Sequence, residues 1–284
     1  MPKIAIITDT DASLPLGLAS QHAITQVPII VLFGEEGFRD VYEIDSTETF
    51  TRIDRDGKLP TTSAPSPGQF SEAFQSAFDD GAESILCLTV SSEVSATYAA
   101  ALTASEMYPD RKIKVIDTRS ITFAQGMMVL AAAKALDSGS SLDEAAATAM
   151  DIGQRTHLFA ALPTLKYLAM SGRVGHLVAG IAGMLSVRPI LTIRDGKLDL
   201  LERVRTQKKS WERVIELCVE SIAGRPVENV AMVHITAPED ARELEALLRT
   251  KLDYPGEIAH IELNPGLAIH AGVGMVGVVF TVEK

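Results

Sequence analysis

Two short segments of the chain are rich in hydroxyl side chains. Residues 61–66 read Thr-Thr-Ser-Ala-Pro-Ser, and residues 91–97 read Ser-Ser-Glu-Val-Ser-Ala-Thr. Both precede a predicted helix at the edge where the strands of a parallel sheet end, and open α/β sheets bind their ligands at that edge. Hydroxyl groups and free amides at helix starts suit an anionic head group. Ordinary helix capping, which uses the same residue types, is the alternative for either segment.

A third polar segment, Asp9-Thr10-Asp11, follows an apolar run. A carboxylate nucleophile beside a second carboxylate is the chemistry of haloacid-dehalogenase-type phosphatases, with Asp9 and Asp11 in those roles. Such enzymes also need a late Gly-Asp motif for Mg²⁺, and that dipeptide never occurs in this sequence. The alternative is a loop at a strand end whose carboxylates cap the next helix.

Residues 272–277, Gly-Val-Gly-Met-Val-Gly, spell the GxGxxG string of dinucleotide sites. That site requires a helix after the string and an acidic residue about 20 positions later. Here only seven residues follow Gly277, and they predict a strand. We therefore interpret the glycines as a turn or a place of backbone crowding. The sequence has no P-loop, GxSxG, HExxH or Cys/His cluster, so no metal or organic cofactor is predicted.

Composition and charge restrict the class of protein. The 284 residues are 46% hydrophobic with a mean hydropathy of +0.16, which excludes a disordered chain. A net charge of −11 disfavours nucleic acid and anionic lipid as partners. No apolar window is long enough to span a membrane, and the first residues lack the pattern of a signal peptide, so we expect a cytoplasmic protein without integral membrane association. Cys87 and Cys218 are predicted to be buried free thiols.

The first 155 residues alternate between strand and helix patterns. The predicted strands are 3–8, 26–33, 84–90 and 112–117, and the predicted helices begin at 13 or cover 45–54, 67–81, 94–107, 121–137 and 141–153. The sharpest helix start is Ser66-Pro67-Gly68-Gln69, which reads as a capping box. This alternation predicts an α/β fold with a mostly parallel sheet and helices on both of its faces.

The second half follows an α+β pattern. A hairpin is predicted over 188–205 with its turn at Asp195-Gly196. The other predicted strands are 157–162, 227–235, 256–263 and 275–282, and the predicted helices are 164–172, 175–186, 206–223, 238–251 and one turn at 266–272. We therefore divide the chain into an N-terminal α/β (Rossmann-like) domain, 1–155, and a C-terminal α+β domain, 156–284.

Six motifs in order resemble those of the DegV family, the fatty-acid-binding proteins that serve as B subunits of bacterial fatty-acid kinase. They are IITDTDASLP, PTTSAPSPGQF, LTVSSEVSATYAAA, LKYLAMSGRV, RPILTIRDGKL with RVRTQKKS, and AIHAGVGMVGVVF. The strand end VIDTRS matches loosely. The sequence departs from the family pattern at four positions, with Ala64 for Gln, Ala96 for Gly, Ala271 for Thr and Val273 for Pro.

The resemblance implies a lipid-binding subunit that is not an enzyme by itself. Such proteins hold a long-chain fatty acid, for example palmitate or oleate, in an apolar tunnel between two α/β lobes. The carboxyl contacts match Thr62, Ser95 and His270 here, and Ser92, Ser63 and Gly272 are further ligand-binding candidates. Another amphiphile in the same pocket is an open alternative. Helix 175–186 and residues Ile29, Val31 and Phe33 are candidate tunnel walls, with plain core as their alternative.

The resemblance also implies a partner. A separate ATP-dependent fatty-acid kinase catalytic subunit phosphorylates the presented carboxylate, and the acyl phosphate feeds phospholipid synthesis. The family's docking residues match Arg173, Arg203 and Arg205, with Lys208 and Lys209 nearby. A solvated basic face is the alternative for these side chains.

Overall fold

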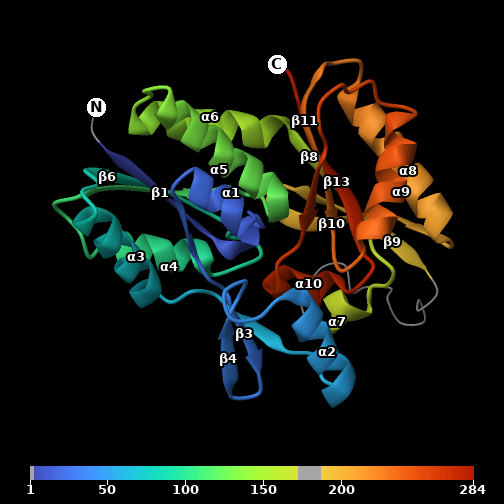
Figure 1. Cartoon of the computed structure of the whole chain (residues 1–284), viewed down its shortest axis with the longest axis horizontal. Helices are drawn as coiled ribbons and strands as arrows, with labels where there is room; N and C mark the ends of the chain where they lie inside the picture. Colours follow the sequence, from blue (N-terminus) through green and yellow to red (C-terminus); the bar gives the residue numbers. More distant parts are fainter. Residues whose placement is uncertain (1–2, 172–186) are drawn as a thin grey trace. The chain divides into compact units, whose positions relative to one another are not determined.

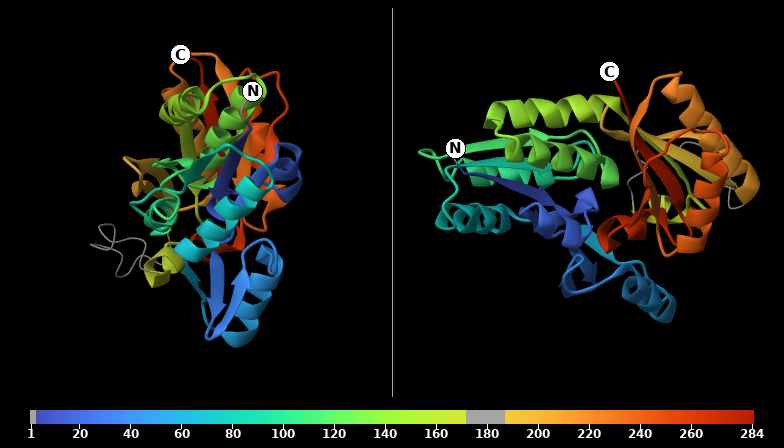
Figure 2. Two further views of the ribbon diagram at one scale, coloured as in Figure 1. Left: turned by 90° about the vertical axis from the view of Figure 1, so that its left-hand side faces the viewer. Right: turned by 45° about the horizontal axis from the view of Figure 1, so that its top comes forward.

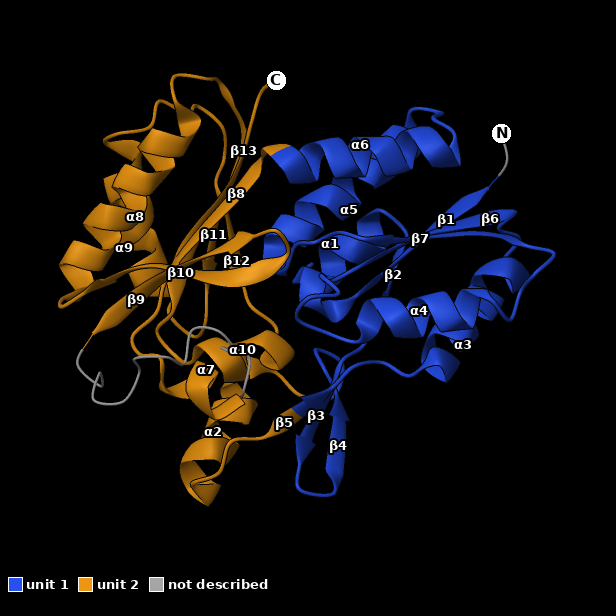
Figure 3. Ribbon diagram, turned by 180° about the vertical axis from the view of Figure 1, so that it is seen from behind, with its two compact units in different colours: residues 1–43, 62–154 blue, residues 44–61, 155–284 orange. Residues whose placement is uncertain are grey.

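The computed structural model describes residues 3–171 and 187–284, which fold into two compact units (Figure 3). Unit 1 comprises residues 1–43 and 62–154, and unit 2 comprises residues 44–61 and 155–284. Residues 44–61, which we assigned to the first domain from sequence, thus group with unit 2. One reason is a hydrogen bond of 2.9 Å from the Ser46 hydroxyl to the carbonyl of Leu263. The predicted helix 175–186 lies outside the described residues.

Unit 1 is built on a parallel sheet with the strand order β2-β1-β6-β7; its strands β1 and β6 are labelled in Figure 1. Its strands are β1 (Ile4–Asp9), β2 (Ile24–Val27), β6 (Ser84–Thr89) and β7 (Lys112–Asp117). The helices are α1 (Leu16–Gln21), α3 (Pro67–Asp79), α4 (Thr97–Ser105), α5 (Thr122–Asp137) and α6 (Leu142–Arg155). The views of Figure 2 show α5 and α6 on one face and α3 and α4 on the other. The predicted sheet with helices on both faces is confirmed.

Local sequence sets the start of α3 as predicted. The Ser66 hydroxyl accepts a bond from the amide of Gln69, and the Gln69 side chain accepts one from the amide of Ser66. This capping box satisfies two donors that the first turn leaves free. Phe70, Phe74 and neighbouring apolar side chains of α3 then pack against Cys87 and other residues of the sheet.

A second, three-stranded sheet has the order β4-β3-β5, with β3 (Ile30–Phe33), β4 (Glu36–Arg39) and β5 (Thr61–Ser63). The prediction of one continuous strand over 26–33 is wrong. The chain leaves the first sheet after Val27 because Pro28 has no N–H for a ladder, and it resumes as β3 in the second sheet. Strands β4 and β5 were not predicted because they are short and mostly polar.

Unit 2 contains a six-stranded sheet with the order β10-β9-β8-β13-β11-β12. All neighbours are antiparallel except β11 and β12. The strands are β8 (Thr156–Ala161), β9 (Arg188–Arg194), β10 (Lys197–Val204), β11 (Val227–His234), β12 (Ala259–Glu262) and β13 (Val276–Val282). Helices α8 (Gln207–Ile222) and α9 (Pro238–Arg249) bury Trp211, Leu244 and other apolar residues against it.

Two local predictions in unit 2 are confirmed. Asp195 and Gly196 both have positive φ, as the tight turn between β9 and β10 requires. The Thr206 hydroxyl accepts a bond from the amide of Lys209 and caps α8. The α+β character predicted for this half therefore describes the unit.

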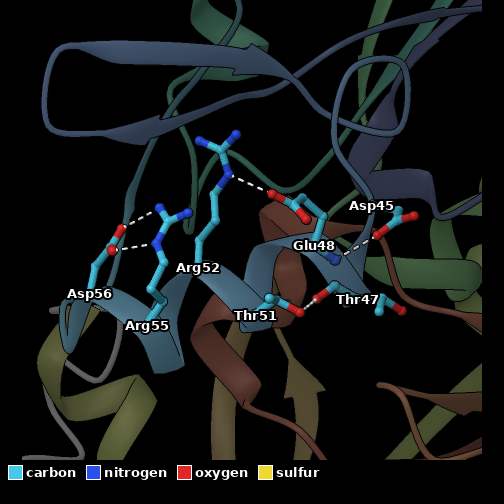
Figure 4. A network of polar contacts seen from close by, with 7 residues as sticks. All are labelled: Asp45, Thr47, Glu48, Thr51, Arg52, Arg55 and Asp56. Carbon is cyan, nitrogen blue, oxygen red and sulfur yellow. Dashed lines mark hydrogen bonds and ion pairs between the residues drawn. The ribbon is translucent and has the colours of Figure 1, made fainter.

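Among its described residues, unit 2 also contains three shorter helices, α2 (Ser46–Asp56), α7 (Lys166–Ser171) and α10 (Pro265–Ala271). Figure 4 shows the polar side of α2, where the Asp45 carboxylate caps the helix by accepting a bond of 2.8 Å from the amide of Glu48. Glu48 also pairs with Arg52. The opposite side of α2 buries Phe50, whose ring meets Tyr167 of α7 edge to face with the centroids 6.3 Å apart.

Candidate functional site

Three polar segments of unit 1 lie at the carboxyl edge of its parallel sheet. Strands β1, β6 and β7 run in the same direction, so the segments that follow them emerge at one edge. The first is a short 3₁₀ turn, η1 (Thr10–Ala12), the second is the loop 90–96 before α4, and the third is residues 118–121 before α5. Open α/β sheets place ligands at this edge.

The loop after β6 is a closed turn around Ser91. Its carbonyl accepts bonds from the amides of Val94, at 3.1 Å, and Ser95, at 3.2 Å, and its own amide donates to the carbonyl of Ser120. The hydroxyls of Ser95 and Thr97 lie 2.8 Å apart, and the amide of Thr97 donates to the Ser95 hydroxyl. Because these bonds close the turn, α4 begins at Thr97, later than the predicted residue 94. Ser95 is half-buried at the head of this helix.

Ser92, a predicted ligand-binding residue, is bound to a carboxylate. Its hydroxyl donates to Asp117 at 2.5 Å, and its amide donates to the other oxygen of the same carboxylate at 3.1 Å. The amide of Arg119 donates to Asp117 as well, and the Arg119 guanidinium lies 3.6 Å from Glu93. Ser92 therefore anchors the loop to the end of β7. Sequence reasoning missed Asp117, although a carboxylate that closes a strand beside a hydroxyl segment is a usable signal.

Asp9, the last residue of β1, is fully buried. One carboxylate oxygen accepts bonds from the amide of Asp11, at 3.0 Å, and from the side-chain amide of Gln125, at 3.3 Å. The other accepts a bond of 2.8 Å from the amide of Val90. Burial raises the pKa of the Asp9 carboxyl to about 6, and the bonds from Val90, Gln125 and Asp11 oppose that rise.

This geometry argues against a nucleophilic role for Asp9. A carboxylate that attacks a phosphoester needs a lone pair that the substrate can reach, and both oxygens of Asp9 face donors inside the fold. Asp11 is only 7% exposed. Another carboxylate nearby, Asp40, is also buried and accepts a bond of 2.8 Å from the hydroxyl of Thr10. The three carboxylates are therefore built into the fold at the end of β1.

The prediction that residues 61–66 follow a strand of the parallel sheet is wrong, because Thr62 and Ser63 lie in β5, in the second sheet of unit 1. Thr62 is half-buried, whereas Ser63 is exposed and its hydroxyl donates to the carbonyl of Ala64. The capping box at Ser66 begins α3 three residues later. Ser92 and Ser95 thus share one loop, and Thr62 and Ser63 come from a different strand of the same unit.

The remaining predicted ligand residues belong to unit 2. His270 lies in the last turn of α10 and is half-buried, and the amide of Gly272 donates to the carbonyl of Ala268 at 2.8 Å. Gly272 has φ of +86° and ψ of 157°, a region that only glycine adopts readily. The string from Gly272 runs into β13, where a Cβ on Gly277 would lie 2.7 Å from the carbonyl oxygen of Phe159. The interpretation of these glycines as a turn and a crowded strand is confirmed.

The predicted docking residues divide between described and undescribed parts of the chain. Arg203 lies in β10 and Arg205 follows it, and both are exposed. Lys208 and Lys209 are exposed in the first turn of α8. Arg173 lies outside the described residues.

Among residues 3–171 and 187–284, no three His, Cys, Asp or Glu side chains are arranged to hold a metal ion. Within the same ranges, no helix has both the length and the apolarity to cross a bilayer.

A family model and known relatives match nearly the whole chain. The model of the DegV family matches residues 3–283. The chain belongs to the DegV family. A DegV domain-containing protein of Streptomyces coelicolor is 33% identical over 276 residues, which cover 97% of each chain. The resemblance inferred from six motifs is thereby confirmed.

Solved structures of similar proteins share the fold. The chain is similar to a fatty-acid-binding DegV protein from Thermus thermophilus, with a TM-score of 0.91, 28% identity and coverage of 99% of this chain and 100% of that one. It is also similar to a stearic-acid-binding protein from Eubacterium ventriosum, with a TM-score of 0.89, 26% identity and coverage of 99% and 98%. The predicted α/β fold class is confirmed by these matches.

Proposed function

We propose that the chain binds a long-chain fatty acid, such as palmitate or oleate, and presents its carboxylate to a separate ATP-dependent kinase subunit. The observation that carries this proposal is the turn 91–97, which holds Ser95 at the carboxyl edge of the sheet in a family whose members include fatty-acid-binding proteins. In this proposal the chain is a cytoplasmic lipid carrier. The kinase supplies the catalytic groups and forms an acyl phosphate for phospholipid synthesis.

The energetics of such a ligand require both an apolar enclosure and polar partners. Burying about 14 methylene groups at roughly 0.8 kcal/mol each stabilises the complex by roughly 11 kcal/mol before losses. Association and ordering remove a large part of that figure. A buried carboxylate without hydrogen bonds would remove several kcal/mol more. The head group therefore needs hydroxyl or amide donors at its end of the pocket.

We assign that role in unit 1 to Ser95 and Thr62. Ser95 is half-buried, and its hydroxyl can exchange its bond to Thr97 for a bond to a carboxylate. Ser92 supports the loop through Asp117. The ligand roles of Ser63, His270 and Gly272 stay predictions.

A direct test is to identify what the protein carries when it is purified from a bacterial host. The protein is denatured and extracted, and the extract is measured by mass spectrometry. We expect about one long-chain fatty acid per chain, and uptake of labelled palmitate or oleate by delipidated protein. A protein that carries no fatty acid and takes up neither palmitate nor oleate would refute the proposal. Extraction of another amphiphile would favour the alternative that the pocket binds a different amphiphilic ligand.

The head-group assignment is tested by Ser95→Ala. Its matched control is Ser138→Ala, because the Ser138 hydroxyl donates to a helix carbonyl, that of Lys134, far from the loop in sequence. We expect Ser95→Ala to weaken fatty-acid binding about tenfold, the loss of one hydrogen bond to a charged group. The control should bind like the wild type. Equal binding by both variants would exclude Ser95 from the site.

Docking of the kinase is proposed to use Arg203 and Arg205 together with Arg173. In a chain of net charge −11, two exposed arginines separated by one residue, Arg203 and Arg205, suit an acidic partner surface. Arg203→Glu with Arg205→Glu should lower acyl-phosphate formation by the kinase and leave fatty-acid binding unchanged. Lys251→Glu, which changes an exposed cation elsewhere in unit 2, is the control. Equal acyl-phosphate formation in all three proteins would refute the docking assignment.

A further inference from the structure

Asp9 poses a physical question that the proposed function leaves open. Removing a carboxylate from water is unfavourable, and this side chain is fully buried at the end of β1. Its compensation is local, because backbone amides of Val90 and Asp11 and the side chain of Gln125 donate to it. Of these three donors, only Val90 directly precedes the turn 91–97 in the sequence.

Two hydrogen bonds from backbone amides connect Asp9 to Ser95 through Val90 and Ser91. The Asp9 carboxylate accepts a bond of 2.8 Å from the amide of Val90. The next residue, Ser91, accepts the amide of Ser95 at its carbonyl. Asp9 therefore binds Val90, and the turn that carries the Ser95 hydroxyl starts at the next residue, Ser91. Asp117 anchors the far side of the same loop through Ser92.

We propose that Asp9 is a positioning residue for the fatty-acid head group: its bond to the amide of Val90 holds the turn 91–97 in the arrangement that presents Ser95. The role of Ser95 in this statement rests on the proposed function. The hydrogen bond itself is a property of unit 1 and is measurable without a ligand.

Several groups face Asp9 and must be considered in a test that varies pH. Asp11 lies on the following turn, and Asp40 accepts a hydrogen bond from the hydroxyl of Thr10, the residue after Asp9. Cys87 of β6 is buried, and burial together with the charge of Asp9 raises the pKa of its thiol, which stays neutral. Gln125 of α5 donates to both Asp9 and Thr8, and its buried carbonyl oxygen has no hydrogen-bond partner among the described residues.

The side-chain carbonyl oxygen of Gln125 can serve as an acceptor when Asp9 is protonated. After a rotation of the Gln125 amide, this oxygen would accept a hydrogen bond from the O–H of the protonated Asp9 carboxyl. The other oxygen of Asp9 would still face Val90, but as a neutral acceptor. Hydrogen bonds to a neutral group are about half as strong as those to a charged one.

Hydrogen exchange measured amide by amide tests the anchor in the ligand-free protein. Asp9→Asn keeps the size of the side chain and places an NH₂ group among three donors. We expect the amides of Val90 and Ser95 to exchange about tenfold faster or more, with residues 85–88 of β6 unchanged. Asp40→Asn is the matched control, because it alters another buried carboxylate of unit 1 and leaves the Val90 bond in place.

The wild-type protein supplies a readout that needs no substitution. After correction for intrinsic rates, exchange at Val90 and Ser95 should accelerate about fivefold as pH falls through 6, where the pKa of Asp9 lies, and should be flat in Asp9→Asn. Unchanged exchange at both amides in Asp9→Asn, or a loss of protection spread over all of β6, would overturn the positioning role.

Ligand binding completes the test and separates it from the proposed function. Asp9→Asn removes one negative charge, and the loss of its Coulomb repulsion alone would strengthen binding of a carboxylate. We expect oleate to bind about tenfold more weakly at pH 7.5, the opposite sign, because the loop is released. If the wild type binds oleate and the variant binds it equally or more tightly, the positioning role is refuted. If the wild type binds no fatty acid, the proposed function fails, and the exchange data still decide whether Asp9 anchors the loop.

Discussion

The ring of Tyr167 occupies the place where a β-carbon on Gly272 would lie, with its Cε2 atom 2.6 Å from that position. The same ring meets Phe50 at an interplanar angle of 89°. Tyr167 therefore joins three segments of unit 2: α2, α7 and the end of α10. The absence of a side chain at residue 272 is a condition of that packing.

Gly272→Ala should destabilise unit 2 more than an ordinary glycine substitution. The new methyl group must displace Tyr167, and the backbone at φ of +86° is strained for alanine, which together amount to about 2–4 kcal/mol. Gly224→Ala is the control, because Gly224 has φ of +78° and open space around its Cα. It should lose only about 1 kcal/mol of unfolding free energy. Equal losses in urea denaturation would mean that Tyr167 moves aside freely.

Ser92 and Asp117 should be energetically coupled. Ser92→Ala removes the hydroxyl donor to the carboxylate, and Asp117→Asn removes the charge that three donors share. We expect each variant to lose about 1 kcal/mol of unfolding free energy, with a coupling energy of about 1 kcal/mol in the double variant. Strictly additive losses in urea denaturation would show that the two side chains do not act together in solution.

The buried carboxyl of Asp9 should make stability depend on pH in an unusual direction. Its pKa rises from 3.8 to about 6 on folding, so its stabilising contribution is complete below about pH 4 and is lost as pH rises through 6. The full effect is on the order of a few kcal/mol. The difference in unfolding free energy between the wild type and Asp9→Asn should therefore fall between pH 4 and pH 7.

That difference is the quantity to measure, because other groups act in the opposite direction. Burial lowers the pKa of His234 and of His157, so each of these histidines favours unfolding as pH falls below 6.5. Both are present in the wild type and in Asp9→Asn, and their effect cancels in the comparison. A difference that stays constant with pH would show that Asp9 titrates equally in the folded and unfolded chain.

The two cysteines should resist modification in the folded protein. Cys87 and Cys218 are fully buried, and burial raises the pKa of both thiols. We expect a disulfide reagent at pH 8 to react at least about 100-fold more slowly with the native protein than with the denatured one. Ser138→Cys, with its exposed position, supplies a thiol that reacts at once. Rapid reaction of the native wild type would show that unit 1 or unit 2 opens locally.

Local signals predicted most elements of the fold. Four residues predict the capping box that starts at Ser66, and two residues predict the turn at Asp195-Gly196. Both predictions are confirmed. The predicted strand 26–33 is wrong because apolar periodicity continues through Pro28, while the hydrogen-bond ladder does not. The short strands β4 and β5 exist only through their pairing with β3, and their own residues carry little signal.

The candidate site was predictable only in part. Hydroxyl segments stand out in the sequence, and the motif order led to the DegV family. The bonds that hold the loop 91–97 were not predicted, because Asp9 meets Val90 across 81 residues and Gln125 across 116. Contacts of that kind follow from the strand order β1-β6 and from the packing of α5, which no local pattern specifies.

The assignment of residues 44–61 to unit 2 has a consequence for synthesis on the ribosome. Helix α2 leaves the ribosome early, but the carbonyl of Leu263 that receives the hydroxyl of Ser46 is made 217 residues later. Helix α2 therefore cannot make this contact until nearly the whole chain has been synthesised. If the chain were produced as two fragments divided at residue 155, the N-terminal fragment would contain α2 without its packing partners, and the C-terminal fragment would expose the surface that α2 covers.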